Sequence, residues 1–237
     1  MKNGYDYVVV GGGSAGCVVA ARLSEDPAVQ VALIEAGPMD DAPEVHTPVA
    51  FPQLFKSEHD WDYSSEPEPS LFARRIYLPR GKVLGGCSSM NAMIYIRGNR
   101  ADYDAWAAEG ATGWSYEELL PYFIKSEANE RGASQFHGAD GPLPVQDGRS
   151  QHPLIDRIIE AFVEAGYPRN EDFNGASQLG AGRFQFTQNN GMRCSTAAGF
   201  LRPARGRANL DILTQATVTR VVLERSRATG IEIQRHG

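Results

Sequence analysis

The chain has 237 residues, of which 42% are hydrophobic and 22% are charged. This composition predicts a globular protein that buries a sizeable core. The formal net charge of −6 excludes the basic surface that is typical of nucleic-acid-binding proteins.

The first elements predicted along the chain are a strand, a glycine-rich loop, a helix and a second strand. Residues 5–10 are rich in β-branched side chains and predict a buried strand. Residues 11–16 have the pattern G-x-G-x-x-G, 17–23 predict a helix, and 29–34 predict a strand that ends at Glu35. This order is typical of a dinucleotide-binding unit, in which a pyrophosphate lies on the N-terminus of the helix.

Glu35 strengthens this interpretation. It follows Gly16 by about 20 residues, which is where a dinucleotide-binding unit places the carboxylate that binds the ribose hydroxyls. A turn with no ligand would leave the placement of this acid to chance. The carboxylate repels a 2′-phosphate and disfavours NADP, whereas NAD and FAD both remain possible from this half.

A second glycine-rich loop follows a long, irregular, lid-like stretch over residues 38–79. It contains Gly85 and Gly86, comes after the basic residues Arg80 and Lys82, and continues to Asn91. Glycines allow a backbone to approach a flat or charged ligand closely. The apolar run 92–96 predicts that a helix begins after this loop.

Further elements are predicted from periodicity and caps. Residues 115–118 form a capping-box pattern that opens a helix. A second helix begins at Pro153, places apolar residues on one face and ends at Gly166; this face holds Leu154, Ile155, Ile158, Ala161, Phe162 and Ala165. Residues 184–187 predict a half-buried strand in which two phenylalanines alternate with polar residues. Residues 210–213, 218–223 and 230–233 predict three short strands.

The three cysteines, Cys17, Cys87 and Cys194, show neither the spacing of a zinc site nor that of a disulfide framework. No apolar run near the N-terminus is long enough to cross a membrane, and no secretory signal pattern precedes it. We therefore expect a cytoplasmic protein without a metal or a transmembrane segment.

Several motifs together resemble the N-terminal part of a glucose–methanol–choline (GMC) oxidoreductase, and the choline-dehydrogenase-like branch in particular. They are residues 6–16, 33–37, 80–91, 95–98, 102–104, 114, 120–123, 137–138, 141–143, 193–197 and 216–221. The resemblance covers essentially the whole chain. It implies an α/β fold in which a Rossmann-like FAD-binding domain, residues 1–150 and 206–237, is interleaved with the start of an α+β substrate domain, residues 151–205.

The resemblance also implies which residues bind FAD. They are Gly11, Gly13, Ser14, Ala15, Gly16, Glu35, Ala36, Val83, Gly85, Gly86, Ser89, Asn91, Ala92, Met93, Ile94 and Val218. Some oxidases of the family bond FAD covalently through a histidine at the position of Met90. Methionine cannot form that bond, so non-covalent FAD is expected here. Cys87 stands where glycine, serine or threonine is more usual in the family.

The activity implied is oxidation of an alcohol, with hydride passing to flavin N5 and oxygen or a quinone as the final acceptor. Family members are longer than this chain, and their catalytic histidine lies in the C-terminal half, so the resemblance implies that this chain corresponds to the N-terminal part alone. None of the five histidines (His46, His59, His137, His152 and His236) has that context, so we expect no catalytic residue in this chain and no turnover by it alone. A catalytically inert flavin-binding fragment and an NAD-dependent dehydrogenase are the alternatives.

Overall fold

The computed structural model describes residues 4–150 and 152–235. The chain divides into two compact units, one of Met1–Ala92 with Met192–Gly237 and one of Met93–Gly191. The predicted boundaries at 150 and 205 differ from this division. Residues 94–147 fall with 185–186 because strands of these two segments pair in one sheet. Which unit binds cofactor and which binds substrate stays a prediction.

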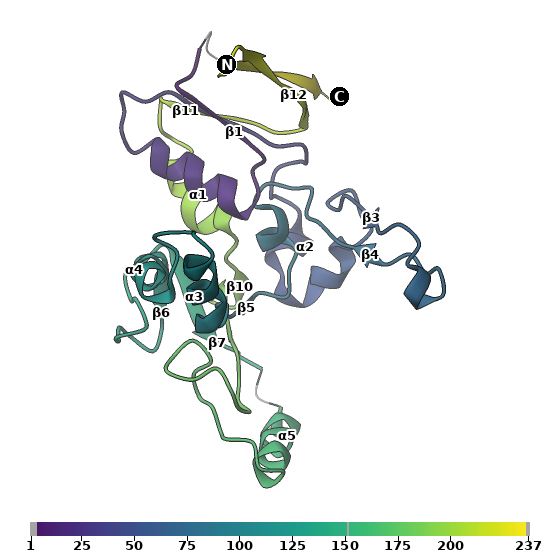
Figure 1. Cartoon of the computed structure of the whole chain (residues 1–237), viewed down its shortest axis with the longest axis vertical. Helices are drawn as coiled ribbons and strands as arrows, with labels where there is room; N and C mark the ends of the chain where they lie inside the picture. Colours follow the sequence, from purple (N-terminus) through teal and green to yellow (C-terminus); the bar gives the residue numbers. More distant parts are fainter. Residues whose placement is uncertain (1–3, 151, 236–237) are drawn as a thin grey trace. The chain divides into compact units, whose positions relative to one another are not determined.

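The first unit is built on a parallel sheet with the order β1-β2-β11, formed by Tyr7–Val10, Val31–Ile34 and Leu210–Leu213. The central strand β2 is buried throughout, which explains its uninterrupted apolar sequence. Helix α1, Ser14–Leu23, packs against β2 and lies beneath the strands in Figure 1. The predicted strand, loop, helix and strand are thus confirmed.

The burial predicted for the first strand is wrong. Tyr7 and Val10 are 50% and 52% exposed, and Val8 is 38% exposed. The physical reason is that β1 lies at the edge of the three-stranded sheet, where only one of its sides has a partner strand among the described residues. β-branched residues favour a strand at an edge as well as in a core.

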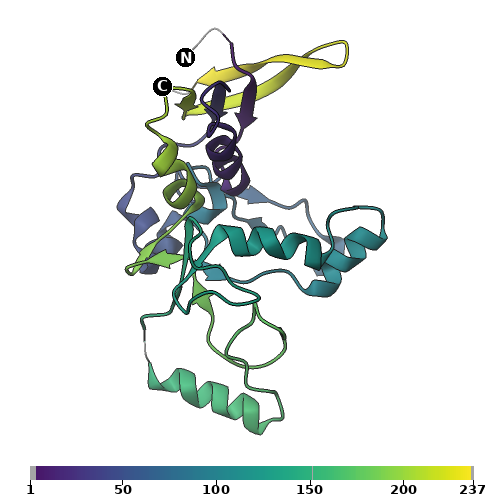
Figure 2. The same ribbon diagram turned by 90° about the vertical axis from the view of Figure 1, so that its left-hand side faces the viewer.

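A long antiparallel hairpin, drawn in yellow in Figure 2, packs on the sheet. It consists of β12, Ala216–Glu224, and β13, Arg227–Arg235, and confirms the last two predicted strands in extended form. Ala216 and Val218 of β12 contact Ala32 and Ile34 of β2. The hairpin therefore brings Val218 to the sheet that carries the glycine loop.

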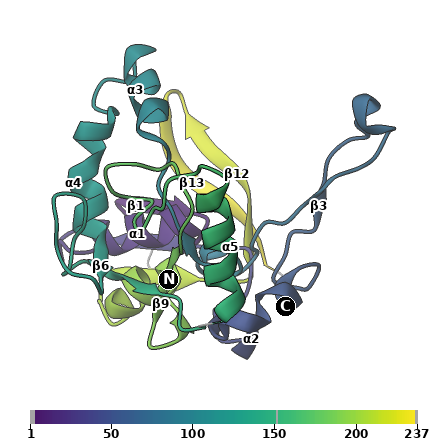
Figure 3. The same cartoon turned by 90° about the horizontal axis from the view of Figure 1, so that it is seen from below.

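Short elements complete the first unit. They are α2 (Pro43–His46), η1 (Pro48–Leu54), β3 (Tyr63–Ser64), η2 (Pro69–Leu71), β4 (Tyr77–Leu78), η3 (Gly86–Ser89), β10 (Met192–Arg193), η4 (Ala197–Leu201) and η5 (Arg202–Ala204). Figure 3 shows β3 on a long arm of the lid-like stretch.

The second unit contains a four-stranded sheet with the order β5-β8-β7-β6. Its strands are Ile94–Tyr95, Gln185–Phe186, Leu143–Asp147 and Glu127–Asn129, and a short strand β9 covers Gln188–Asn189. The helices are α3 (Arg100–Ala108), α4 (Tyr116–Ser126) and α5 (Pro153–Glu164).

The two helices predicted from caps are confirmed, but one predicted after the second glycine loop is wrong. The backbone N–H of Ser115 donates to Glu118 Oε2 over 3.1 Å in the capping box that opens α4. Residues 94–95 form β5 instead of a helix. Met93 has a φ of +61°, a left-handed conformation that a continuous helix does not contain.

The apolar face predicted for α5 is largely open to solvent. Leu154, Ile158 and Phe162 are 57%, 48% and 49% exposed, and within the described residues of this helix only Ile159 is buried. Figures 1 and 2 both show α5 standing apart from the other helices of its unit.

The predicted alternation at residues 184–187 is reversed in the structure. Gln185 is 7% exposed and Phe184 is 37% exposed. Gln185 Oε1 accepts a 2.9 Å hydrogen bond from Asn129 Nδ2, so the polar side chain faces the interior. It belongs to a buried polar cluster, and hydrophobicity alone cannot reveal an inward glutamine with a partner far along the chain.

Glu127 lies at the centre of this cluster and is fully buried. Its carboxylate is 2.8 Å from Arg97 Nη2 and 2.9 Å from His137 Nδ1, while His137 Nε2 is 2.9 Å from Asp172 Oδ2. The hydrogen bond to Glu127 and that to Asp172 raise the pKa of His137 above its ordinary value, against the opposing effect of burial. Two acceptors on one imidazole favour the doubly protonated ring.

This arrangement predicts a pH-dependent contribution to stability. Because the folded-state pKa of His137 is raised, its contribution is complete below the unfolded pKa of about 6.5 and is lost as the pH rises through the folded value. The wild type should therefore have a higher unfolding free energy than His137→Gln, and the difference between the two proteins should be largest at acidic pH. Urea unfolding of both proteins across pH measures this difference, and a difference that does not change with pH would contradict it.

Candidate functional site

The first glycine loop joins β1 to the N-terminus of α1. Gly11 has a φ of +90°, and its N–H donates to the carbonyl of Ile34 over 2.8 Å. Gly13 is the N-cap residue of α1, and in the described residues no side chain caps this end. The first N–H groups of the helix, from Ser14 to Gly16, are those that an α-helix leaves without internal partners. This is the arrangement that binds a phosphate.

Gly16 is required by packing. A Cβ added to it would lie 1.9 Å from the carbonyl oxygen of Gly11, far inside van der Waals contact. A Cβ on Gly13, by contrast, would meet nothing within 4 Å. One glycine therefore lets the helix approach the strand, and the other leaves space beside the helix N-terminus.

The second glycine loop packs directly on the first. Gly85 N–H donates to the carbonyl of Gly12 over 2.6 Å, and a Cβ on Gly86 would lie 2.7 Å from Gly13 Cα. Both Gly85 and Gly86 have positive φ angles, +91° and +54°. The two loops predicted separately from the sequence are thus one structure.

Glu35 connects the first loop to the chain beyond β2. Its Oε2 accepts from Gly12 N–H over 2.7 Å and its Oε1 from Gly37 N–H over 2.8 Å. The residue is 5% exposed, and burial raises the pKa of Glu35, although both backbone hydrogen bonds act in the opposite direction. A carboxylate has about four lone-pair sites, so Glu35 keeps acceptor capacity for a further donor.

A cavity of about 270 Å³ lies over these residues in the first unit. Its lining includes five residues predicted from the sequence: Gly11, Gly13, Glu35, Ala36 and Val218. It also includes residues that were not predicted to bind the cofactor: Val10, Ile34, Trp61, Gly81, Ala216 and Thr217. The cavity is therefore bounded by the glycine loop, the end of β2, the lid-like stretch and the hairpin.

Trp61 is the most informative of the missed residues. Its ring stacks on Tyr63 with centroids 5.7 Å apart, and Lys82 Nζ lies 5.1 Å from the ring centroid. The only signal in the sequence was an aromatic residue within the lid-like stretch. Such a residue offers a flat surface to a ligand ring, and this suits the adenine end of a dinucleotide.

The other predicted site residues lie in several places. Val83 and Ser89 are completely buried, and Ser89 Oγ donates to the carbonyl of Leu84 over 2.7 Å. Asn91 and Ala92 are exposed in the first unit. Met93 and Ile94 belong to the second unit, where Met93 is buried and Ile94 is 45% exposed.

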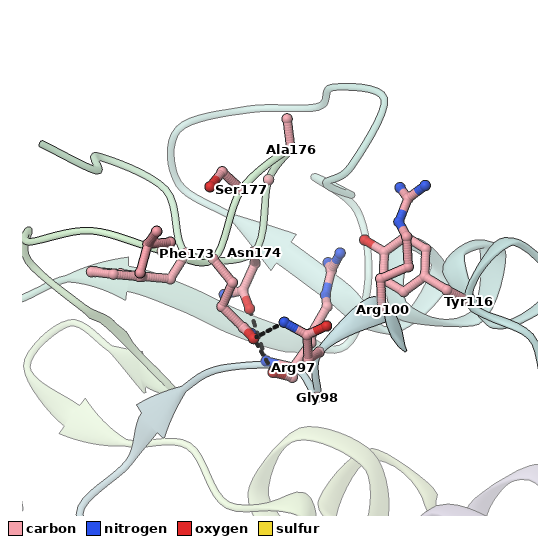
Figure 4. Close-up of a pocket in the computed structure, with 12 residues that line it drawn as sticks. Arg97, Gly98, Arg100, Tyr116, Phe173, Asn174, Ala176 and Ser177 are labelled. Atoms are coloured by element: carbon pink, nitrogen blue, oxygen red, sulfur yellow. Dashed lines mark hydrogen bonds between the residues drawn. The ribbon is translucent and has the colours of Figure 1, made fainter. Parts of the chain in front are cut away.

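A different cavity of about 320 Å³ lies in the second unit between the start of α3 and residues 173–179 (Figure 4). None of the predicted site residues lines it. Its polar groups bond to one another: Arg97 N–H donates to Asn174 Oδ1 and Gln178 Nε2 donates to the Arg97 carbonyl, each over 2.8 Å. Arg100 lies over the ring of Tyr116, 4.4 Å from its centroid.

Two negative expectations bear on the described part of the chain. There, no group of three or more histidine, cysteine or acidic side chains could hold a metal ion. No helix within 4–150 or 152–235 is both long and apolar enough to span a bilayer.

Cys17 has a structural role beside the first glycine loop. Its Sγ donates to the carbonyl of Gly12, and burial raises the pKa of its thiol to about 11.

Comparisons with known proteins agree on one family. The family model described as GMC oxidoreductase matches residues 5–237. Mitochondrial choline dehydrogenase of Homo sapiens is 46% identical over 244 residues, which cover 100% of this chain and 41% of that protein. An alcohol dehydrogenase [acceptor] of Pseudomonas putida is 45% identical over 229 residues, which cover 96% of this chain and 42% of that protein.

Solved structures show the same likeness. Pyridoxine 4-oxidase from Mesorbium loti has a TM-score of 0.93 and 38% identity, and the match covers 98% of this chain and 46% of that one. An FAD-dependent oxidoreductase from Chaetomium thermophilum has a TM-score of 0.91 and 30% identity over 98% of this chain and 42% of that one. The predicted α/β fold is confirmed, and the chain spans about two fifths of the length of the curated relatives it matches.

Proposed function

Because the chain belongs to the GMC oxidoreductase family, we propose that its first unit binds FAD and that the protein oxidises the CH–OH group of alcohols. The observation that carries the proposal is a cavity that joins a helix N-terminus without a side-chain cap, a buried carboxylate and an aromatic side chain. FAD, when bound, supplies the hydride acceptor that protein side chains lack.

Each lining group has a role that its chemistry suits. Residues 11–16 bind the pyrophosphate through backbone N–H groups at the start of α1. Glu35 accepts hydrogen bonds from ribose hydroxyls with its remaining lone pairs, and the backbone of Ala36 lies beside it. Val218 and Trp61 contact the adenine. These assignments rest on the geometry of the cavity and on the resemblance of the motifs.

The second glycine loop supports the middle of the cofactor. Gly85 and Gly86 hold the first loop in place, and the buried Val83 and Ser89 fix the ends of the turn. The backbone of residues 91–94 is proposed to pass along the isoalloxazine ring. The positive φ of Met93 supports an unusual backbone role for this segment.

We propose non-covalent FAD because of Met90. Its side chain is 2% exposed and packs in an apolar cluster with Val45 and Leu54, and a thioether cannot take the place of an imidazole that bonds to flavin. Acid precipitation of the purified protein should therefore release all yellow colour into the supernatant as intact FAD. Colour that stays with the washed precipitate would mean a covalent link elsewhere.

The proposed alcohol oxidation needs a base, and we propose that the described histidines do not supply it. None of the four histidines in the described part of the chain lines the cavity of the first unit. His137 is buried in the second unit, with both ring nitrogens bonded to carboxylates. We therefore expect that this chain, loaded with FAD, does not oxidise alcohols by itself, since general-base assistance typically contributes about 10²–10⁴-fold.

Anaerobic mixing of the FAD-loaded chain with choline and with aliphatic and aryl alcohols tests this expectation. The flavin spectrum should stay oxidised, whereas dithionite, the positive control, should bleach it. Rapid bleaching by an alcohol, lost on replacing one histidine, would show that a base lies within this chain.

The final electron acceptor in the proposed reaction is oxygen or a quinone.

An NAD-dependent dehydrogenase is the second candidate, because the first glycine loop and Glu35 suit either dinucleotide. The packing of the second glycine loop on the first favours FAD, since a simple NAD-binding unit has no need of it. A flavin absorption spectrum in the purified protein distinguishes the two.

A further inference from the structure

Arg193 is a buried cation to which the described residues supply no counterion. The residue is 3% exposed, and burial alone lowers the pKa of its guanidinium to about 10. In the described part of the first unit no carboxylate forms an ion pair with it, whereas the buried Arg97 of the second unit pairs with Glu127 over 2.8 Å. An unpaired buried charge is costly, so its presence calls for an explanation.

The hydrogen bonds of Arg193 all lead to neutral groups, which lie on two separate segments of the first unit. Its Nε donates to the carbonyl of Val45, at the end of α2, over 2.7 Å. Its Nη1 donates to the carbonyl of Ser88, in η3, over 3.1 Å and to Asn91 Oδ1 over 2.9 Å. Its Nη2 is buried and has no partner among the described residues. The side chain thus binds the second glycine loop at Ser88 and Asn91 and connects this loop to α2.

Thr196, which follows Arg193 shortly after the end of β10, also binds the second glycine loop. Thr196 N–H donates to Ser88 Oγ over 3.0 Å, and Ser88 Oγ in turn donates to the carbonyl of Gly85 over 2.6 Å. Gly85 donates to Gly12 in the first glycine loop. A continuous chain of hydrogen bonds therefore runs from the segment 193–196 to the loop at the helix N-terminus.

We propose that Arg193 is a positioning residue for the cofactor: it fixes residues 88–91 so that the second glycine loop keeps its place against the first. The inference rests on the proposed function, because the positioned loop serves FAD only if FAD binds there. The guanidinium suits the task, since its planar fork reaches several carbonyls at fixed angles, whereas a lysine ammonium is a single point on a flexible stem.

The test compares Arg193→Met and Arg193→Lys with the matched control Arg207→Met. Arg207 donates to the carbonyl of Ala21 and to Ser24 Oγ, and both of these acceptors lie outside the two glycine loops. The affinity for FAD is measured by flavin fluorescence, the environment of the bound flavin by its visible circular dichroism, and stability by thermal unfolding of the apoprotein.

Arg193→Met should raise the Kd for FAD at least tenfold and change the visible circular dichroism of the flavin that still binds. Arg193→Lys should recover only part of the affinity. Arg207→Met should lower the unfolding temperature and leave the flavin spectrum unchanged. If Arg193→Met and Arg207→Met change Kd and spectrum alike, or if Arg193→Met binds FAD as the wild type does, the positioning role is overturned.

Two further arms keep the outcome decisive. Where Arg193→Met does not fold, Asn91→Ala removes one of the gripped acceptors. It should raise the Kd less and change the spectrum in the same direction, and an unchanged spectrum and Kd overturn the proposal. Wild-type protein that binds no FAD would refute the proposed function itself, and this result is separate from any effect of Arg193.

Discussion

Replacing Gly16 with alanine should abolish FAD binding and lower the unfolding free energy by roughly 1–3 kcal/mol or more. The added Cβ would lie 1.9 Å from the carbonyl oxygen of Gly11 and 3.0 Å from its carbonyl carbon. Neither atom belongs to a flexible side chain, so α1 must move away from β1 and take its N-terminal N–H groups with it. Urea unfolding and flavin fluorescence measure the two effects.

Gly13→Ala is the matched control within the same loop. Its φ of −76° suits alanine, and the added Cβ meets nothing within 4 Å. We expect the fold to keep its stability and FAD to bind more weakly, because the methyl group occupies the space through which a phosphate approaches the helix. If Gly16→Ala proves as stable and as tightly bound to FAD as the wild type, the packing role of Gly16 is wrong.

Replacing Glu35 with alanine should raise the Kd for FAD by on the order of ten- to a hundredfold. A hydrogen bond to a charged group contributes roughly 1.5–3 kcal/mol, which corresponds to that range of affinity. The variant also leaves the N–H groups of Gly12 and Gly37 without the acceptor that they share in the wild type. Flavin fluorescence on a folded variant measures the change.

Glu35→Gln separates the two roles of the side chain. Glutamine keeps one acceptor oxygen but turns a donor toward one of the two glycine N–H groups, so it should bind FAD with intermediate affinity. Wild-type affinity in both variants would remove Glu35 from the site. If Glu35→Ala fails to fold and Glu35→Gln folds, the main role of Glu35 is to hold Gly12 and Gly37 in place, and its binding of FAD is secondary.

The sequence predicted the parts of the site that are contiguous in the chain. The glycine pattern at 11–16, the following helix and the acid at 35 are local features whose geometry follows from backbone rules. The capping box at Ser115 was predictable for the same reason. The hydrogen bond between Gly12 and Gly85 could not be predicted, because the positions of two loops in the sequence do not determine which N–H of one loop donates to which carbonyl of the other.

Features decided by distant partners escaped prediction. The alternation at 184–187 suggested inward phenylalanines, yet Gln185 is the buried residue because Asn129 lies opposite it. The run after Asn91 suggested a helix, yet Met93 adopts a left-handed conformation and Thr187 N–H donates to its carbonyl over 2.9 Å. Trp61 lines the cavity because the lid-like stretch folds back over the first glycine loop.

The exposure of α5 and β1 shows a limit of another kind. Amphipathic and β-branched patterns indicate that a face can be buried, and they do not state what covers it. Leu154, Phe162 and Val10 remain about half exposed in the described residues although the patterns around them are clear. Both elements were predicted correctly, whereas the burial predicted for β1 was wrong.

Titration of the flavin-free protein with FAD and, separately, with NAD tests the central claim most directly. Quenching of flavin fluorescence follows FAD binding, and the intrinsic tryptophan fluorescence, to which Trp61 in the cavity lining contributes, follows either ligand. The account predicts that FAD binds at one site per chain, that Glu35→Ala weakens it, and that an excess of NAD does not displace it. Saturable binding of NAD with no binding of FAD would contradict the account.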